Sequence, residues 1–125
     1  MRRILVIDDE RSIRTIISML LENLGYRVEV AADGKEGIEI FHRFGDVDLV
    51  ITDIRMPNMD GNEVARHIRK SDRPMTPLVA VTGYIEEVQM KVFDFALIKP
   101  FKLDQLRNVI QSFSVAALTS AMEIV

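Results

Sequence analysis

Side chains suited to phosphoryl chemistry follow four of the five apolar stretches of this chain. They are Asp8 with Asp9, Asp53, Thr82 and Lys99. If the stretches are adjacent parallel strands, these groups converge on one edge of a sheet. Three carboxylates that lie close together repel one another, so they must either take up a proton or bind a cation. A set of oxygen ligands without His or Cys favours a hard ion, and we expect Mg²⁺.

The remaining two groups are complementary to a phosphate. Thr82 offers a hydroxyl and Lys99 a point charge, and both suit a phosphoryl group, whose charge is spread over its non-bridging oxygens. Because Ser, Cys and His are absent from the strand ends, the nucleophile should be a carboxylate. Asp53 is the best candidate, since it stands alone between the metal ligands and the Thr-Lys pair, and an aspartyl phosphate follows. Each residue singly has a structural explanation as a helix cap, turn former or solvated charge, but the combination favours a functional site.

Five short apolar stretches, separated by helical patterns, must position these groups. The predicted strands cover residues 4–7, 28–31, 49–53, 78–82 and 95–98. Helices are expected over 11–24, from an Asp33 cap, from near Gly61 and from near Leu103, while 83–94 holds at most a short helix. Strands that are apolar on both faces belong to parallel sheets covered by helices, and ligands bind beyond their carboxyl ends.

Composition limits the class of protein. With 125 residues, 48% of them apolar and 28% charged, the chain has the make-up of one soluble globular domain. A net charge of -3 provides no basic footprint, so we expect no direct binding to nucleic acid. The absence of Cys suits a reducing cytosol. Four apolar residues after Arg3 are too few for a signal-peptide core or a membrane span, so a cytoplasmic protein without a membrane partner is expected.

The motifs together resemble the response-regulator receiver domain of bacterial two-component signalling. They are residues 7–10 (Ile-Asp-Asp-Glu), Asp53 with 56–61 (Met-Pro-Asn-Met-Asp-Gly), 81–83 (Val-Thr-Gly) and 99–101 (Lys-Pro-Phe). The resemblance implies a CheY-like, flavodoxin-like (βα)5 doubly wound parallel sheet with strand order 2-1-3-4-5. It covers residues 1–113, and residues 114–125 would extend the last helix or begin a linker.

The resemblance also implies roles for the site residues. Asp53 would accept a phosphoryl group from a histidine kinase, a phosphotransfer protein or acetyl phosphate. Asp9 and Asp53 would bind Mg²⁺ together with the backbone carbonyl of Arg55, and Asp8 would act through a bound water. Thr82 and Lys99 would hold the phosphoryl oxygens. The Lys99-Pro100 bond is a candidate for the cis form, and the first helix is the expected docking face for the kinase.

Two departures from the family pattern affect the expected output. Only sixteen residues separate Thr82 from Lys99, about 1.5 helical turns fewer than the family pattern, so the fourth helix should be short or replaced by a loop. The family's switch aromatic falls three positions before the lysine, where this chain has Ala96. The usual movement of an aromatic side chain behind Thr82 is therefore not expected, and the surface that carries output should be altered.

Other functions fit parts of the pattern. An aspartyl-phosphate phosphatase needs a second Asp two residues after the nucleophile, but Arg55 occupies that position, so we expect a signalling module rather than an enzyme. A constitutive docking module would keep the fold without the switch. Arg55 and Tyr84 flank the expected path of the hydrolytic water, which predicts slow loss of the phosphoryl group. His42 and His67 are expected at the surface, and the chain should be a monomer or a weak dimer.

Overall fold

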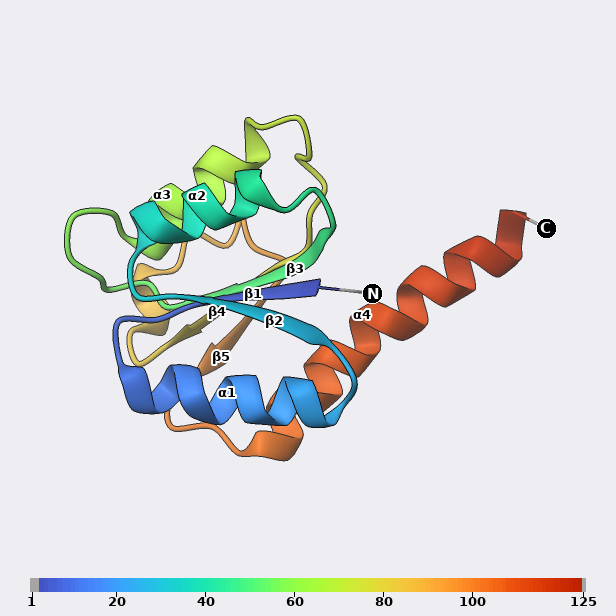
Figure 1. Cartoon of the computed structure of the whole chain (residues 1–125), viewed down its shortest axis with the longest axis horizontal. Coiled ribbons are helices and arrows are strands. Elements are labelled where there is room, and N and C mark those ends of the chain that lie inside the picture. Colours follow the sequence, from blue (N-terminus) through green and yellow to red (C-terminus); the bar gives the residue numbers. More distant parts are fainter. Residues whose placement is uncertain (1–2, 125) are drawn as a thin grey trace.

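The chain forms a five-stranded parallel sheet with helices on both faces (Figure 1). The computed structural model describes residues 3–124, and their side chains as far as residue 114. The elements follow in the order β1 (Arg3–Ile7), α1 (Arg11–Asn23), β2 (Arg27–Ala31), α2 (Gly34–Arg43), β3 (Val47–Thr52), α3 (Gly61–Arg69), β4 (Leu78–Thr82), η1 (Ile85–Glu87), β5 (Phe95–Ile98) and α4 (Leu103–Ile124).

Strand order is β2-β1-β3-β4-β5, and every neighbouring pair is parallel, which confirms the predicted fold class. The register brings the strand ends to one edge of the sheet, where β4 reaches two residues beyond the end of β3, because Thr52 lies beside Ala80. Ile7, the last residue of β1, lies beside both Ala31 of β2 and Thr52 of β3, and Thr82 of β4 lies beside Ile98 of β5. The residues that follow these strands therefore meet at one edge of the sheet.

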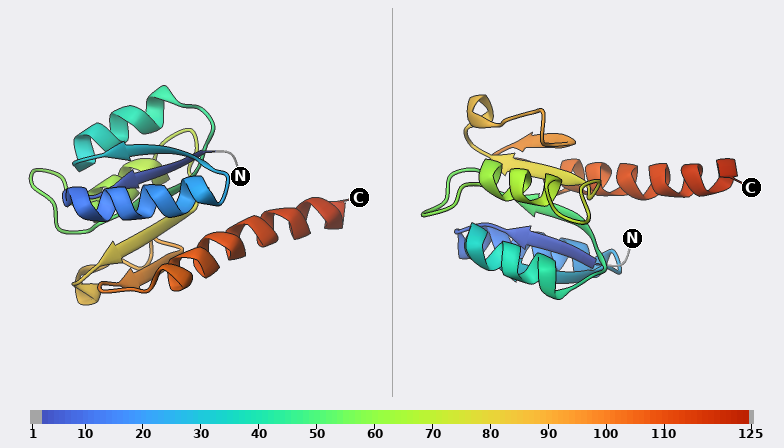
Figure 2. Two further views of the ribbon diagram at one scale, coloured as in Figure 1. Left: turned by 60° about the horizontal axis from the view of Figure 1, so that its bottom comes forward. Right: turned by 90° about the horizontal axis from the view of Figure 1, so that it is seen from above.

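The helices form two layers (Figure 2). α1 and α4 pack on one face of the sheet, where Ile17 and Leu106 are fully buried, and α2 and α3 cover the other face with residues such as Phe41 and Ile68. The predicted Asp33 cap is confirmed, because its side chain accepts a hydrogen bond from the backbone N–H of Glu36 at 2.8 Å. Satisfying this otherwise unpaired donor helps to start α2 at Gly34.

The segment between β4 and β5 contains no α-helix, as the short spacing predicts. It has a single 3-10 turn, η1, at Ile85–Glu87. Val88 and Phe93 from this segment are buried against the α2–α3 side of the core. Two side chains of this loop thus contribute to that side of the core, in a segment where no full helix was expected.

The last helix, α4, runs past the sheet, away from the edge at which the strands end (Figures 1 and 2). Its continuation to Ile124 is consistent with the helix extension expected for residues 114–125, although Val125 lies outside the described residues. Within the described part of the chain, no helix combines the length and the apolar character needed to cross a membrane.

Candidate functional site

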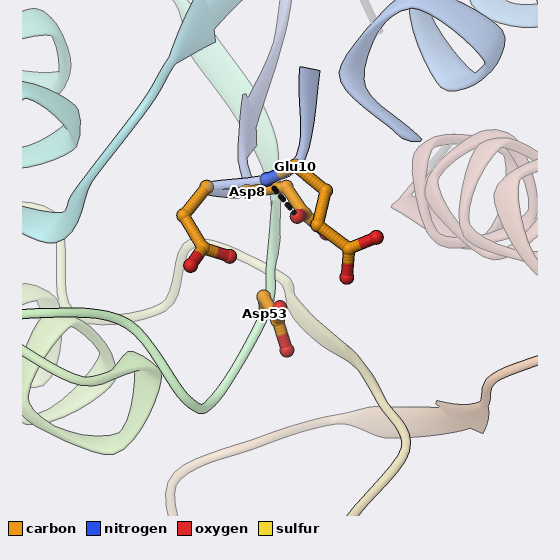
Figure 3. A group of neighbouring side chains, drawn as sticks. Asp8, Glu10 and Asp53 are labelled. Carbon is orange, nitrogen blue, oxygen red and sulfur yellow. Dashed lines mark hydrogen bonds between the residues drawn. The ribbon is translucent and has the colours of Figure 1, made fainter. Parts of the chain in front are cut away.

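Four carboxylates gather at the edge where β1 and β3 end (Figure 3). Asp8, Asp9, Glu10 and Asp53 each offer an oxygen, and these oxygens lie within 4.8 Å of one another. The N–H of Asp53 donates to the carbonyl of Ile7 at 2.8 Å, so the pairing of β1 with β3 fixes the separation of the two aspartate-bearing ends. Asp8 and Asp53 are buried, whereas Asp9 and Glu10 are exposed.

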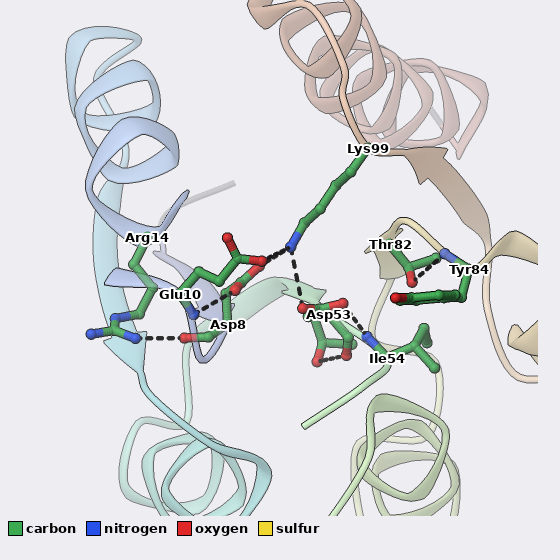
Figure 4. A network of polar contacts seen from close by, with 9 residues as sticks. Asp8, Glu10, Arg14, Asp53, Ile54, Thr82, Tyr84 and Lys99 are labelled. Carbon is green, nitrogen blue, oxygen red and sulfur yellow. Dashed lines mark hydrogen bonds and ion pairs between the residues drawn. The ribbon is translucent and has the colours of Figure 1, made fainter. Parts of the chain in front are cut away.

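Lys99 places a positive charge inside this cluster (Figure 4). Its Nζ lies 2.9 Å from Oδ2 of Asp8, 3.2 Å from Oδ2 of Asp53 and 3.5 Å from Oε1 of Glu10. The lysine follows β5 directly, its N–H donates to the carbonyl of Thr82 at 2.8 Å, and the Lys99-Pro100 bond is cis, as predicted. Only 15% of the side chain is exposed, so the ammonium is held between two buried carboxylates.

Burial dominates the electrostatics of the site. Loss of water raises the pKa of Asp8 above its ordinary value, although the ammonium of Lys99 opposes this shift. Burial also raises the pKa of Asp53, the charge of Asp8 raises it further, and Lys99 again acts in the opposite direction. For Lys99, burial by itself lowers the pKa, but the hydrogen bond and charge of Asp8 together with the charge of Asp53 leave it raised. Four carboxylates meet here and Lys99 pairs with three of them, so negative charge is in excess, which favours a bound cation.

The loop that follows β3 is shaped by one glycine. Gly61 packs so closely that a Cβ at this position would lie 2.0 Å from the carbonyl oxygen of Asp53. The N–H of Gly61 donates to the carbonyl of Ile54 at 2.9 Å, and Oδ1 of Asp53 accepts from the N–H of Ile54 at 2.7 Å. One oxygen of Asp53 is therefore oriented by the backbone, and the other faces Lys99.

Thr82 is the last residue of β4, two residues beyond Ala80, which lies beside the last residue of β3 (Figure 4). The residue is fully buried, and its Oγ1 accepts a hydrogen bond from the N–H of Tyr84 at 3.0 Å. Of the residues predicted for the site, Asp8, Asp53 and Lys99 are in direct contact, whereas the described hydrogen bond of Thr82 involves the loop after β4. The hydroxyl is at the site but is not bonded to the carboxylates.

Arg55, predicted for its backbone carbonyl, has a side-chain arrangement that was not predicted. Its guanidinium carbon lies 3.4 Å from the ring centroid of Tyr84, and its Nε and Nη2 donate to the carboxylate of Glu87 at 2.9 and 2.5 Å. The hydrogen bond from Arg55 lowers the pKa of Glu87. Together with Asp9 and Asn62, Arg55 and Glu87 line a cleft of about 520 Å³. The arrangement covers one side of the site with a cation and an aromatic ring.

Sequence reasoning missed two acidic residues. Glu10 lies within the carboxylate cluster, and its position directly after the Asp8-Asp9 pair was the available signal. Glu87, which anchors Arg55, is 32 residues away from it, in a segment whose fold the sequence did not specify. Only the tertiary structure brings that pair together.

Comparison with known proteins decides the family. The family model described as "Response regulator receiver domain" matches residues 4–111. The chain belongs to this family. The receiver domain is 41% identical over 114 residues to "Probable transcriptional regulator ycf27" of Porphyridium aerugineum, covering 88% of the chain and 47% of the relative. It is 35% identical over 117 residues to "Regulatory protein AtoC" of Escherichia coli K12, covering 87% of the chain and 24% of the relative.

A third relative is named as a sensor kinase and not as a regulator. The receiver domain is 38% identical over 119 residues to the "CAI-1 autoinducer sensor kinase/phosphatase CqsS" of Vibrio cholerae, covering 90% of the chain and 17% of that protein. The chain spans less than half the length of each of these three relatives. Receiver domains of this sequence type are thus found in both regulators and sensor kinases.

Solved structures of similar proteins have the same fold as this chain. The response regulator TrrA of Thermotoga maritima, in complex with Mg²⁺-BeF, is 34% identical with a TM-score of 0.81, over 90% of this chain and 99% of that one. The receiver domain of the sensor histidine kinase PA1611 of Pseudomonas aeruginosa, with magnesium in its active-site cleft, is 30% identical with a TM-score of 0.81, over 90% and 96%. Members of the family therefore bind Mg²⁺, and this chain has an acidic cluster at the edge where β1 and β3 end.

Proposed function

We propose that this receiver domain accepts a phosphoryl group on Asp53 and thereby changes its binding to a partner. The observation that carries the proposal is the contact of Lys99 with both Asp8 and Asp53, at an edge where four carboxylates meet. A carboxylate beside a fixed ammonium is placed to attack phosphorus while the ammonium balances charge on the phosphoryl oxygens. Thr82 would complete the set of donors through its O–H, while its oxygen goes on accepting from the N–H of Tyr84.

The transfer forms one bond and breaks another. An oxygen of ionised Asp53 attacks the phosphorus of a phosphohistidine or of acetyl phosphate, and the P–N or P–O bond to the donor breaks. The imidazole or acetate leaves with the electron pair. During this step Lys99 would exchange its contact with Oδ2 of Asp53 for a phosphoryl oxygen, and it would keep Asp8 as its anchor. Asp53 must be ionised to attack; Lys99 lowers its pKa against the raising effects of burial and of Asp8, and a bound metal ion would act in the same direction as Lys99.

The donor set fits Mg²⁺. The ligands available are carboxylate oxygens of Asp9 and Asp53, the backbone carbonyl of Arg55, and Asp8 through a water, and no His or Cys lies in the cluster. Arg55 and Asp9 line the same cleft. When bound, the ion would neutralise the carboxylates and polarise the phosphoryl group. This proposal makes the domain Mg²⁺-dependent and assigns it no catalytic turnover of other substrates.

Labelling with acetyl phosphate tests the phosphoacceptor. The purified chain with Mg²⁺ should gain one phosphoryl group, seen as a single mass increment, and Asp53→Asn should abolish it. Asp60→Asn is a matched control, because Asp60 accepts a hydrogen bond from the N–H of Glu63 as a helix cap and should leave labelling intact. Full-stoichiometry labelling of Asp53→Asn would exclude the proposed site, and labelling that persists in EDTA would exclude the metal requirement.

The affinity for a partner, measured with and without a phosphoryl analogue, distinguishes a phosphorylation switch from a constitutive docking module. We propose that a histidine kinase or phosphotransfer protein docks on α1, and that output uses the surface around η1 and β5, which has Ala96 in place of an aromatic. Binding of a candidate partner should change when beryllofluoride and Mg²⁺ are added. Equal affinities in both states would favour the docking module, because a ligand shifts a population only through differential affinity.

The wider context is also proposed. Residues 1–113 would form the receiver unit in the cytoplasm, as a monomer or weak dimer, without membrane contact and without nucleic-acid contact by this domain. Residues 114–125 would extend α4 toward the output partner. Co-purification of the full-length protein with its partners, before and after phosphorylation, tests these assignments.

A further inference from the structure

A pair of histidines lies on the surface formed by α2 and α3, outside the phosphoryl site. His42 is in the last turn of α2 and His67 in the last turns of α3, and both are exposed. Their Nε2 atoms are 2.8 Å apart, and the ring centroids are 5.1 Å apart with an interplanar angle of 72°. The two residues are 25 positions apart in the sequence and meet because α2 packs beside α3 (Figure 1).

This separation is close to the one that a metal ion imposes on two neighbouring ligands. With metal–nitrogen bonds of about 2.05 Å, two nitrogens at right angles are about 2.9 Å apart, and two at the tetrahedral angle about 3.35 Å. The observed 2.8 Å matches the right-angled arrangement. Right-angled coordination by imidazole nitrogen is typical of Cu²⁺ and Ni²⁺.

The surroundings permit binding. Phe41, which is buried, packs against the ring of His42 with centroids 5.6 Å apart and an interplanar angle of 74°. Two neighbouring cations are directed at other groups, because Arg66 donates to Gln89 and Arg69 donates to Asp94. Each imidazole must turn so that the two lone pairs converge, and solvent exposure leaves room for that rotation. Water molecules would fill the remaining coordination positions.

We propose that His42 and His67 form a two-histidine site for a divalent transition ion of the Cu²⁺ or Ni²⁺ type, which links α2 to α3. Both rings must present an unprotonated Nε2, so the ring that now donates in the hydrogen bond moves its proton to Nδ1. Protons compete with the metal for these lone pairs, and affinity therefore falls at low pH. A bound ion would add a cross-link between the two helices and stabilise the fold by mass action.

Ni²⁺ titration of the untagged chain tests the site, with excess Mg²⁺ present to compete with Ni²⁺ for the carboxylate cluster. Because the chain contains two histidines, each ring resonance can be assigned from one single variant. In the wild type, both resonances should broaden together as one equivalent of Ni²⁺ is added. His42→Ala and His67→Ala should each weaken Ni²⁺ binding about 100-fold, because the second ligand contributes an intramolecular contact.

The control is Lys35→Ala, which changes an exposed residue of the same helix and should leave Ni²⁺ affinity unchanged. Circular dichroism and the melting temperature without metal verify that each variant is folded. Ni²⁺ should raise the melting temperature of the wild type but not of either histidine variant. Broadening of the two rings at unrelated concentrations, or an unchanged affinity in His42→Ala, would show that the pair is only a hydrogen bond and would overturn the proposal.

Discussion

Removing the charge of Lys99 should destabilise the metal-free receiver domain. The change is Lys99→Met, which keeps an apolar side chain of similar length and deletes the ammonium. Asp8 and Asp53, with side chains 2% and 8% exposed, would then lose the cation that lies 2.9 and 3.2 Å from them. At an effective dielectric constant of 20, each contact corresponds to an attraction of about 5–6 kcal/mol.

The net cost is smaller than the sum of these attractions, because burying the ammonium itself costs several kcal/mol. Breaking a buried pair by deleting one partner typically costs about 3–5 kcal/mol. Lys99 retains 15% exposure, so we expect the lower end, a loss of about 3 kcal/mol in the free energy of unfolding at pH 7. Mg²⁺ should reduce this loss in the free energy of unfolding, since the ion supplies the missing positive charge to the same carboxylates.

Urea unfolding measures the effect, with and without Mg²⁺, in four proteins: wild type, Lys99→Met, Asp53→Asn and the double variant. Because Asp53→Asn removes one of the two carboxylates, the loss caused by Lys99→Met should be smaller in that background by about 1 kcal/mol or more. A loss below about 0.5 kcal/mol, typical of an ordinary surface change, would refute the reasoning. An equal loss in both backgrounds would show that Lys99 does not act through Asp53.

Three further predictions concern the same edge of the sheet. Burial raises the pKa of Asp53 in the folded state, so a proton binds more tightly to the folded than to the unfolded chain. The metal-free wild type should therefore gain stability relative to Asp53→Asn as the pH falls from 7 through the raised pKa. A difference in unfolding free energy that stays constant with pH, measured by urea unfolding, would contradict this. Trimming Arg55 and Tyr84 to Ala should speed loss of the phosphoryl group about tenfold, equivalent to about 1.4 kcal/mol of barrier, if they shield the hydrolytic water; decay followed by mass spectrometry should be unchanged if they do not. Gly61→Ala should lower the free energy of unfolding by about 3 kcal/mol or more, because its Cβ would overlap the carbonyl of Asp53. Gly45→Ala, whose Cβ would have nothing within 4 Å, should change it by no more than about 0.5 kcal/mol. Similar urea midpoints for these two variants would contradict the steric argument.

The positions of Asp8, Asp53, Thr82 and Lys99 were predictable because Thr82 is the last residue of its strand and each of the others follows a strand directly. In a parallel sheet the carboxyl ends of the strands share one edge, so a residue's place in the sequence relative to its strand is enough to assign it to that edge. The register bears this out, with Ile7 beside Thr52 and Thr82 beside Ile98. The absence of an α-helix between β4 and β5 was predictable from the spacing of Thr82 and Lys99, which is short compared with the family pattern.

Strand starts were less well predicted than strand ends. β3 begins at Val47, two residues before the predicted start, and the register shifts between Arg3 and Ile4 where the extra residues pair with β1. β2 likewise begins at Arg27 rather than Val28. Asp48 and Arg27 are polar and interrupt the apolar pattern at these strand starts, so only the hydrogen bonds of the assembled sheet show that they belong to the strands.

The sequence by itself determined which polar groups lie where the strands end, because local apolar patterns mark the end of each strand. Only the tertiary structure decided which side chains from separate elements meet: Lys99 between Asp8 and Asp53, Arg55 on Glu87, and His42 against His67. Those contacts depend on how helices and loops pack across the sheet and on the rotamers that this packing allows. Because no local pattern specifies that packing, the sequence predicted where the chemistry lies and the fold decided how its charges are paired.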